Sequence, residues 1–434
     1  MKKILVLALS SMCSLLFADA PKYVFVFIGD GMSVPQRMVA EEYSQKLGKG
    51  KLTLNHLSTH ATTRTCSATS LVTDSAASGT AIACGVKTYN GAIGVDDDKN
   101  KVESMAEAAK KAGRKVGIVT TVTLSHATPS AFYAHRQSRG LVYQIALDLI
   151  NSDFEYFAGG GLPRHDDKKD DEYCGNIFDL AESKGYKVLD KTDEFRKLKP
   201  SDGKVIYTAK RGDSMFYAID NDGSEPTLAE LTAKGIEMLD NPNGFFMMVE
   251  GGKIDYAAHN DDAATVFQEV LDFDAAVAVA YEFYKKHKDE TLIIVTADHE
   301  TGGLVLGYRG DYSLNLKALS SQKVSVERMI EILQAQKETT WGHIEELVKE
   351  YIGVKPRGNR NADEKVTVDH SLASEIAYGA IYDLNRSAAL SWASGNHSGT
   401  FVPLFAIGKG AEKFNGVIDN TDVPKIIREL KGVE

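Results

Sequence analysis

The sequence has few cysteines, no surplus of basic residues and none of the common glycine-rich loops that cradle nucleotide phosphates. Four of its 434 residues are cysteines, and a chain of this length does not depend on disulfides to fold. A net charge of −10 argues against general nucleic-acid binding, though not against small anionic substrates. Neither G-x-G-x-x-G nor G-x-x-x-x-G-K-S/T occurs, so a nucleotide-binding protein of the dinucleotide or P-loop type is disfavoured. The missing G-x-S-x-G elbow disfavours a serine hydrolase of the acyl type.

The first twenty residues predict a secretory signal. Lys2 and Lys3 precede an apolar run over 4–16, and cleavage is expected after Ala18. Cleavage after Ala20 is the alternative, which the following Pro21 disfavours. A membrane anchor is the opposing interpretation, but the run is short for a span. We therefore expect residues 1–18 to be removed and residues 19–434 to be exported to the periplasm or the extracellular space, with no membrane span.

Three cysteines follow that segment, namely Cys66, Cys84 and Cys174. An odd number leaves at least one free thiol if all pairing is internal. The spacing of Cys66 and Cys84 leaves open whether these two form a disulfide.

Near-continuous apolar runs alternate with helical patterns along the chain. Such runs are typical of strands buried on both faces of a parallel sheet. The longest helical pattern covers Asp261–Lys288, where only Asp274 interrupts an apolar face. The sequence therefore predicts an α/β fold with a large doubly wound, mostly parallel central sheet flanked by helices. The predicted strands are Tyr23–Ile28, Lys115–Thr121, Gly244–Val249, Thr291–Thr296 and Pro403–Ile407.

Two segments interrupt this alternation. Residues 163–176 form a charged surface loop by composition. Residues 305–390 form a long insertion with an amphipathic stretch from Val324 to Tyr351. We interpret the insertion as a crown-like or lid-like segment, or as a surface that faces a second subunit.

Ser75 lies where a strand-like run, Ser70–Val72, gives way to the small helix-forming residues Ala76 and Ala77. Unpaired backbone N–H groups and the helix dipole make a helix N-terminus favourable for an anion. With metal ligands and an arginine elsewhere in the chain, this position suggests a serine that attacks phosphorus.

Acidic residues follow two of the predicted strands. Asp30 lies between two glycines in GDGMS, where an Asp in a tight turn is the simpler interpretation. Glu250 follows a buried strand, where a carboxylate must be paired or bound to a metal. Asp255 and His259 are four residues apart, so one helical turn can direct both to one cation. A capping Asp with a surface His explains that pair equally well.

Two further motifs carry histidines. In TADHETGG, Asp298 and His299 can face one ion only if the preceding strand has ended, which Gly302 and Gly303 favour. In SGNHSGT, His397 lies in a loop of small residues before a buried strand, and a plain loop or core histidine is the default interpretation.

The motifs GDGM, TDSAAS, HATP with a downstream SR, VEGG–ID–H, ADH and NHSG occur in an order similar to that of the alkaline phosphatases. The sequence resembles that family from about Tyr23 to the C-terminus, and the insertion at 305–390 matches only in placement. The resemblance implies a metal-dependent hydrolase of phosphate monoesters with broad specificity, most often a homodimer.

The resemblance also implies two zinc ions and one magnesium ion per chain. It assigns Asp255, His259 and His397 to the first zinc. Asp298, His299 and Asp30 match the ligands of the second zinc. Asp30 would be shared with the third metal, whose other ligands would be Thr128 and Glu250.

By the same resemblance, Ser75 is the nucleophile that forms a phosphoserine, and Arg139 binds the phosphoryl oxygens. Two positions vary in the family, and here they are His126 and Tyr256. His126 can shift the third site from magnesium towards zinc or cobalt, and Tyr256 can contact phosphate through water.

Two other functions stay open on the sequence alone. A phosphodiesterase of the same superfamily usually lacks the third set of metal ligands, which Thr128 and Glu250 would provide here. A non-catalytic periplasmic protein that binds metal or phosphate would need the ligands but not Ser75.

Overall fold

The computed structural model describes residues 20–210, 212–308, 310, 312–358 and 360–430. The predicted signal segment, 1–18, lies outside the described residues. Within the described ranges, no helix is both long enough and apolar enough to cross a membrane.

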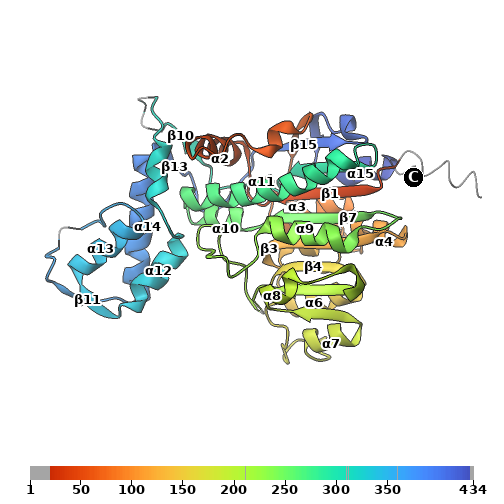
Figure 1. Ribbon diagram of the computed structural model, residues 1–434, viewed down its shortest axis with the longest axis horizontal. Coiled ribbons are helices and arrows are strands. Elements are labelled where there is room, and N and C mark those ends of the chain that lie inside the picture. The colour runs from red at the N-terminus through yellow and green to blue at the C-terminus, as the bar shows by residue number, and fades with distance from the viewer. Residues whose placement is uncertain (1–19, 211, 309, 311, 359, 431–434) are drawn as a thin grey trace, which may run out of the picture.

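A ten-stranded sheet with the order β16-β2-β15-β8-β1-β7-β3-β4-β6-β5 forms the centre of the molecule (Figure 1). Among its described strands only β15 runs antiparallel to the others, so the predicted mixed, mostly parallel sheet is confirmed. Its strands are β1 (Tyr23–Gly29), β2 (Thr59–Arg64), β3 (Lys115–Thr123), β4 (Tyr156–Gly160), β5 (Tyr186–Leu189), β6 (Lys204–Thr208), β7 (Phe245–Gly251), β8 (Thr291–Thr296), β15 (Val402–Gly408) and β16 (Gly416–Asp419).

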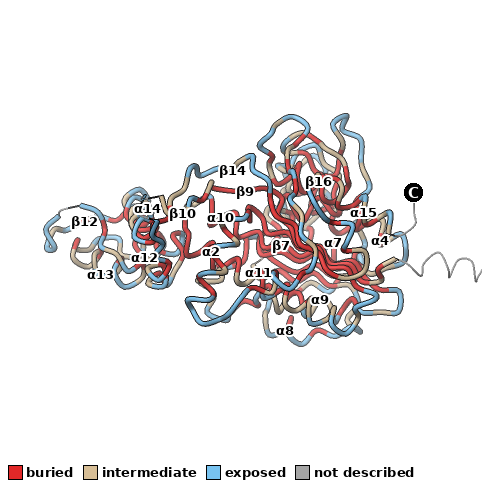
Figure 2. The backbone as a smooth tube through the Cα atoms, turned by 90° about the horizontal axis from the view of Figure 1, so that it is seen from above, coloured by how far each residue is buried: buried red, intermediate tan, exposed pale blue. Residues whose placement is uncertain are grey.

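Helices cover both faces of the sheet because the central strands are apolar on both sides. All of β1 is buried, and alternate residues point to opposite faces. Phe25 and Phe27 enter the core beneath α2, α9 and α11, whereas Val24 and Val26 enter the core beneath α3, α4, α6, α7 and α15. Figure 2 shows these buried strands between more exposed outer segments.

The helices differ widely in length. Those that cover the sheet or follow its strands are α2 (Val34–Lys46), α3 (Ser75–Cys84), α4 (Met105–Lys111), α5 (Ala127–Ser130), α6 (Val142–Asn151), α7 (Ile177–Ser183), α8 (Thr192–Arg196), α9 (Leu228–Leu239), α10 (Lys253–His259), α11 (Ala263–Lys286) and α15 (Asp422–Leu430). Short 3-10 helices cover Thr53–His56, Pro200–Asp202, Leu316–Ser321 and Ala411–Lys413.

The longest helix, α11, corresponds to the pattern predicted over Asp261–Lys288. Asp262 caps it by accepting a hydrogen bond from the Thr265 N–H at 3.2 Å. Asp274, the polar residue on its apolar face, is buried and accepts hydrogen bonds from the N–H groups of Thr53 at 2.8 Å and Leu54 at 3.0 Å. The carboxylate therefore holds the neighbouring 3-10 helix against α11.

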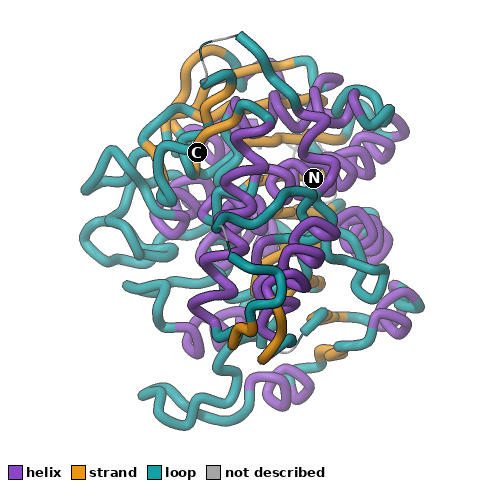
Figure 3. Tube along the Cα trace, turned by 90° about the vertical axis from the view of Figure 1, so that its left-hand side faces the viewer, coloured by secondary structure: helices purple, strands orange, loops and turns teal. Residues whose placement is uncertain are grey.

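Residues 305–390 form a helical segment beside the main body, at the left of Figure 1. Seen from that side, it presents helices and loops to the viewer (Figure 3). The amphipathic stretch predicted over Val324–Tyr351 consists of two helices, because the chain turns at Lys337, whose φ is +57°, and forms a short strand. The elements are β10 (Val305–Leu306), α12 (Val326–Ala335), β11 (Glu338–Thr340), α13 (Trp341–Tyr351), β12 (Lys365–Thr367), α14 (His370–Ser387) and β13 (Leu390–Ser391).

Two local expectations need comment. The strand-like run Ser70–Val72 is a bend rather than a strand. Leu71 is 74% exposed, so no sheet neighbour covers its side chain. The open question about Cys66 and Cys84 is also answered, because both are free thiols, as is Cys174.

Candidate active site

The predicted site residues gather at the carboxyl edge of the central strands. Asp30 follows β1, Thr128 lies beyond β3, Glu250 is the penultimate residue of β7, and Asp298 follows β8. In a parallel sheet these ends share one edge, which is the usual ligand-binding edge of doubly wound folds.

His397 reaches the same edge by a different route. It precedes β15 in sequence, and a residue before a parallel strand would lie at the opposite edge of the sheet. Because β15 runs antiparallel to β8, its beginning lies beside the ends of the other strands. The two-residue strand β14 (His397–Ser398) then pairs with β9 (Glu300–Thr301), with His397 opposite Thr301.

The first cluster consists of Asp255, His259 and His397, whose ligand atoms lie within 4.8 Å of one another. The Nε2 atoms of the two histidines are 3.3 Å apart, and the Asp255 carboxylate oxygens lie 3.3 Å from His259 Nε2 and 3.6 Å from His397 Nε2. The Nδ1 atom of His259 contacts the Gly395 carbonyl at 2.8 Å, and that of His397 contacts the Thr73 carbonyl at 2.9 Å. An Nδ1–H donated to a carbonyl leaves the Nε2 lone pair free for a cation.

The second cluster consists of Asp30, Asp298 and His299, all fully buried. His299 Nε2 lies 3.3 Å from Asp30 Oδ1 and 3.2 Å from Asp298 Oδ2. The same nitrogen lies 3.1 Å from Ser75 Oγ. Ser75 therefore points into the second cluster rather than towards solvent.

The third cluster joins Asp30 and Glu250 with His126. Thr128 Oγ1 donates to Asp30 Oδ2 at 3.4 Å, which places the hydroxyl beside this group. Thr120 donates a short hydrogen bond to Glu250 Oε2. Asp30 belongs to both the second and the third cluster.

Three carboxylates share one arrangement, in which one oxygen is held by the protein and the other is left free. Asp298 Oδ1 accepts from the N–H groups of Gly31 at 3.2 Å and His299 at 3.0 Å. The remaining oxygens, Asp298 Oδ2, Asp30 Oδ1 and Glu250 Oε1, are buried without a hydrogen-bond partner among the described residues. Buried oxygens of this kind need a proton or a cation, so the residues fit bound metal ions.

Burial makes these carboxyls unusually weak acids. It raises the pKa of Asp298 to about 7 and that of Glu250 to about 8. Burial and the neighbouring Asp298 charge raise the pKa of Asp30 well above its ordinary value. Without a metal the folded chain therefore holds protons here, and a divalent cation would displace them.

The pKa values of the imidazoles shift in both directions. Burial lowers the pKa of His299 to about 4 and that of His126 to about 3, so both rings are neutral at pH 7. The hydrogen bond to Asp255 raises the pKa of His259 to about 9. Burial opposes ionisation of Asp255, but the hydrogen bond with His259 and the charges of the neighbouring imidazoles together outweigh burial and hold the pKa of that carboxyl below its usual range.

Ser75 is the first residue of α3 and is 2% exposed. Asp74 caps this helix, since its Oδ1 accepts from the N–H groups of Ala77 and Gly91, both at 3.0 Å. The serine hydroxyl thus lies at the positive end of a capped helix, which favours an anion beside it.

Asp74, the residue before Ser75, also binds Arg139. Its Nη1 donates to Asp74 Oδ2 at 3.1 Å, and its Nη2 donates to His126 Nε2 at 3.0 Å. The guanidinium side chain is 34% exposed, so an incoming ligand can reach it. Tyr256 packs edge-on against the His126 ring, with ring centroids 5.7 Å apart.

Sequence reasoning missed two supporting residues. Asp74 could have been found from its position, because an Asp directly before a helix is an expected cap. Thr301 donates to Asp255 Oδ1 and contacts His299 Nδ1 at 3.2 Å, so it links the first two clusters. No sequence signal distinguishes Thr301 from other threonines.

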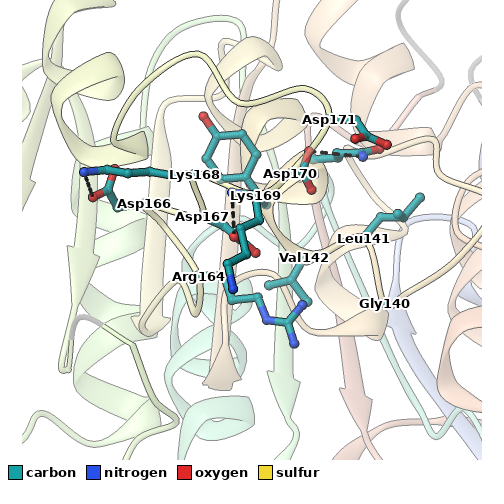
Figure 4. A pocket seen from close by; sticks show the side chains of 12 residues that line it. Gly140, Leu141, Val142, Arg164, Asp166, Asp167, Lys168, Lys169, Asp170 and Asp171 are labelled. Carbon is teal, nitrogen blue, oxygen red and sulfur yellow. Dashed lines mark hydrogen bonds and ion pairs between the residues drawn. The ribbon is translucent and has the colours of Figure 1, made fainter.

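A cavity of ≈ 880 Å³ is lined by none of the residues of these clusters. It is an open hollow between the charged loop and the residues that follow Arg139. In Figure 4, Lys168 turns towards Asp166, and acidic and basic side chains alternate along the loop. No single charge dominates its walls, so we assign it no role in the chemistry.

Comparisons with known proteins match nearly the whole described chain. A family model described as alkaline phosphatase matches residues 21–433. Alkaline phosphatase 4 of Bacillus subtilis (strain 168) is 36% identical over 368 residues, which cover 83% of this chain and 76% of that protein. The crystal structure of a cold-active alkaline phosphatase from the psychrophile Shewanella sp. has a TM-score of 0.81 at 28% identity, and the match covers 94% of this chain and 99% of that one. A TAB5 alkaline phosphatase variant in which aspartate replaces a histidine, with Mg bound in its M3 site, has a TM-score of 0.70 at 28% identity and covers 96% of this chain and 99% of its own.

Proposed function

The chain belongs to the alkaline phosphatase family, and from that premise we propose that it hydrolyses phosphate monoesters to an alcohol and inorganic phosphate through a phosphoserine on Ser75. The observation that carries this proposal is the position of Ser75 Oγ, 3.1 Å from His299 Nε2 at the edge of the second cluster. A serine hydroxyl is a weak nucleophile until an adjacent base or a metal ion activates it.

The residues of the site divide the reaction between them. Arg139 grips two non-bridging phosphoryl oxygens, which a planar guanidinium can do with two N–H groups at once. The N-terminus of α3 supports the same negative charge. Ser75 Oγ then attacks phosphorus, the ester P–O bond breaks, and the alcohol leaves. Water attacks the phosphoserine in the second step, which releases phosphate and restores the hydroxyl.

The donor sets suit two zinc ions and one magnesium ion. Each of the first two clusters combines imidazole with carboxylate, which is a typical zinc ligand set. The hydroxyl of Thr128 and the carboxylates of Asp30 and Glu250 suit the harder magnesium ion. When bound, such ions polarise phosphoryl oxygens and lower the pKa of the attacking hydroxyl groups.

His126 would allow the third site to bind either magnesium or a softer ion. Its ring belongs to the same group of ligand atoms as Asp30 and Glu250, and imidazole suits zinc or cobalt. The TAB5 variant, whose histidine is replaced by aspartate and which carries Mg in its M3 site, supports the view that a carboxylate at such a position favours magnesium.

The phosphoryl contacts above do not touch the alcohol portion, so we propose that many monoesters are accepted. We also propose export after cleavage of residues 1–18, one catalytic domain over 19–434, and a homodimer in which the insertion at 305–390 acts as a lid or as part of the subunit contact.

Two measurements test the central proposal. Metal analysis of the purified chain is expected to give two zinc ions and one magnesium ion, with the third position also open to zinc or cobalt. Ser75→Ala is expected to keep these metals but to lose turnover of 4-nitrophenyl phosphate and labelling by radioactive phosphate. Equal turnover by both proteins would refute the role of Ser75.

The other two functions predict different results. A phosphodiesterase would hydrolyse a bis(4-nitrophenyl) ester faster than the monoester. A binding protein would hold phosphate without turnover. The family assignment and the complete third ligand set favour the monoesterase over both.

A further inference from the structure

Three hydrogen bonds in series connect the surface of the molecule with the second cluster. Lys87 Nζ donates to Asn420 Oδ1 at 2.6 Å, and Asn420 Nδ2 donates to Ser78 Oγ at 2.9 Å. Ser78 Oγ donates in turn to the backbone carbonyl oxygen of Asp298 at 2.6 Å. All three bonds are donated in the direction of Asp298, and hydrogen bonds aligned in this way strengthen one another.

The inner part of this series is closed to solvent. Asn420 and Asp298 are fully buried and Ser78 is 1% exposed, so solvent does not replace a bond that is lost there. At the outer end, Lys87 also forms an ion pair with Asp419 at 2.9 Å, and its side chain is 24% exposed. Removal of a side chain should therefore have its largest effect at Ser78 and Asn420.

Ser78 and Ser75 lie three residues apart on α3, which makes them neighbours on one side of the helix. The Ser75 hydroxyl lies 3.1 Å from His299 Nε2, and the Ser78 hydroxyl binds the carbonyl of Asp298, the preceding residue. One turn of α3 thus contacts two consecutive residues of the second cluster. The bond of Ser78 fixes the distance of this turn from the cluster, and with it the position of Ser75 Oγ.

The C-terminal part of the described chain holds α3 at two places. Asn420 lies between β16 and α15 and binds Ser78 in the first turn of α3. Arg428 of α15 donates to the carbonyl of Cys84, the last residue of α3, at 3.2 Å. The backbone N–H of Asn420 donates to the Arg64 carbonyl at 3.0 Å, which fastens Asn420 to the end of β2. The amide that binds Ser78 is therefore itself held by the sheet.

We propose that Ser78 and Asn420 are positioning residues, which hold α3 at the distance from the second cluster at which the Ser75 hydroxyl can attack phosphorus. They act through Ser75 and Asp298. The proposal rests on the phosphomonoesterase function above and adds two residues to those that the reaction requires. Loss of either side chain should slow the attack and weaken Asp298 as a ligand. Arg139 should still bind phosphate, because separate hydrogen bonds hold its guanidinium.

The test uses the full chain with Ser78→Ala, Asn420→Ala and the double variant. Alanine favours the helix at position 78. In the metal-loaded single variants, kcat/KM for 4-nitrophenyl phosphate should fall about tenfold, while the inhibition constant of inorganic phosphate should change less than about twofold. A chelator titration followed by elemental analysis, which needs no turnover, should show a zinc affinity about tenfold lower. The double variant should lie within about twofold of Ser78→Ala, because both residues act in one series.

Thr80→Ala is the matched control. Thr80 is fully buried on the same helix. Its hydroxyl donates to the Ala92 carbonyl at 3.2 Å and accepts from the Gly94 N–H at 3.0 Å, and neither partner belongs to a metal cluster. This variant should lose stability as Ser78→Ala does, but keep the kcat/KM and the zinc affinity of the wild type.

Wild-type kcat/KM and zinc affinity in Ser78→Ala would overturn the proposal, as would an equal loss of both in Thr80→Ala. A phosphate inhibition constant that rises as far as kcat/KM falls, or losses that simply add in the double variant, would also overturn it. If Ser78→Ala does not fold, Asn420→Ala decides by the same measurements. If the wild type hydrolyses no monoester, the function proposed above is refuted, and the zinc titrations still decide whether the two residues support the second cluster.

Discussion

The link between Asp74 and Arg139 gives the sharpest prediction. The two carboxylate oxygens of Asp74 make different contacts. Oδ1 caps α3 and accepts a hydrogen bond from the Gly91 N–H, whereas Oδ2 forms an ion pair with Arg139 at 3.1 Å. Asp74→Asn keeps an oxygen for the cap but loses the acceptor for the guanidinium. Asp74→Ala loses both.

The size of each effect follows from exposure and geometry. The Asp74 and Arg139 side chains are 21% and 34% exposed, so solvent screens the ion pair. Loss of the pair should therefore weaken the binding of phosphate by at most about 1 kcal/mol. In Asp74→Asn, KM and the inhibition constant of inorganic phosphate should rise by up to about fivefold. Loss of the cap in Asp74→Ala should remove about 1 kcal/mol from the free energy of unfolding as well.

Steady-state kinetics with phosphate as inhibitor measures the positioning of Arg139, and denaturant unfolding measures the capping of α3. Asp97→Asn removes a charge from the exposed residue Asp97 and serves as the control. An unchanged phosphate inhibition constant in Asp74→Asn would refute the positioning of Arg139 by this carboxylate. Equal destabilisation by Asn and Ala would refute the cap.

Three further predictions concern the metal clusters. His126→Asp should strengthen activation by magnesium, because a carboxylate is a harder ligand than imidazole, and superimposable magnesium titrations of variant and wild type would contradict this. Gly31→Ala should lower the metal content per chain, because the glycine has a φ of +72° and a new Cβ would lie 2.8 Å from Thr301 Oγ1; elemental analysis matching the wild type would contradict it. The metal-free protein should lose thermal stability as pH rises from about 6.5 to about 8. Burial raises the pKa of Asp298 to about 7 and that of Glu250 to about 8, so in this range the folded chain retains protons that the unfolded chain has released, and stability falls with rising pH. Calorimetry of chelator-treated protein checks this against metal-loaded protein, and a Tm that rises over the same range would show that the sign is wrong.

The strands and the longest helix could be predicted because their sequence patterns are strong and local. The run at 291–296 is apolar on both faces and became β8 with the same bounds. The pattern over 261–288 became α11 with a difference of two residues at each end. The prediction failed where the local pattern did not show whether the residues are buried. At Ser70–Val72, small and apolar residues lie in an exposed bend.

The residues of the site could be proposed from motifs, but their convergence could not be worked out from periodicity alone. His397 is the clearest case, because a mostly parallel sheet would place it at the wrong edge, and only the antiparallel direction of β15 brings it to His259. The bonds of Thr301 with Asp255 and of Asp74 with Arg139 join distant segments, and such pairings leave no mark on local composition.

The spread of the ligands along the polypeptide has a consequence for biosynthesis. Asp30 leaves the ribosome several hundred residues before His397, yet both belong to the joined clusters at one edge of the sheet. A growing polypeptide therefore carries no finished first cluster until residue 397 has been translated, and a product of premature termination before that residue should be inert whatever metals surround it.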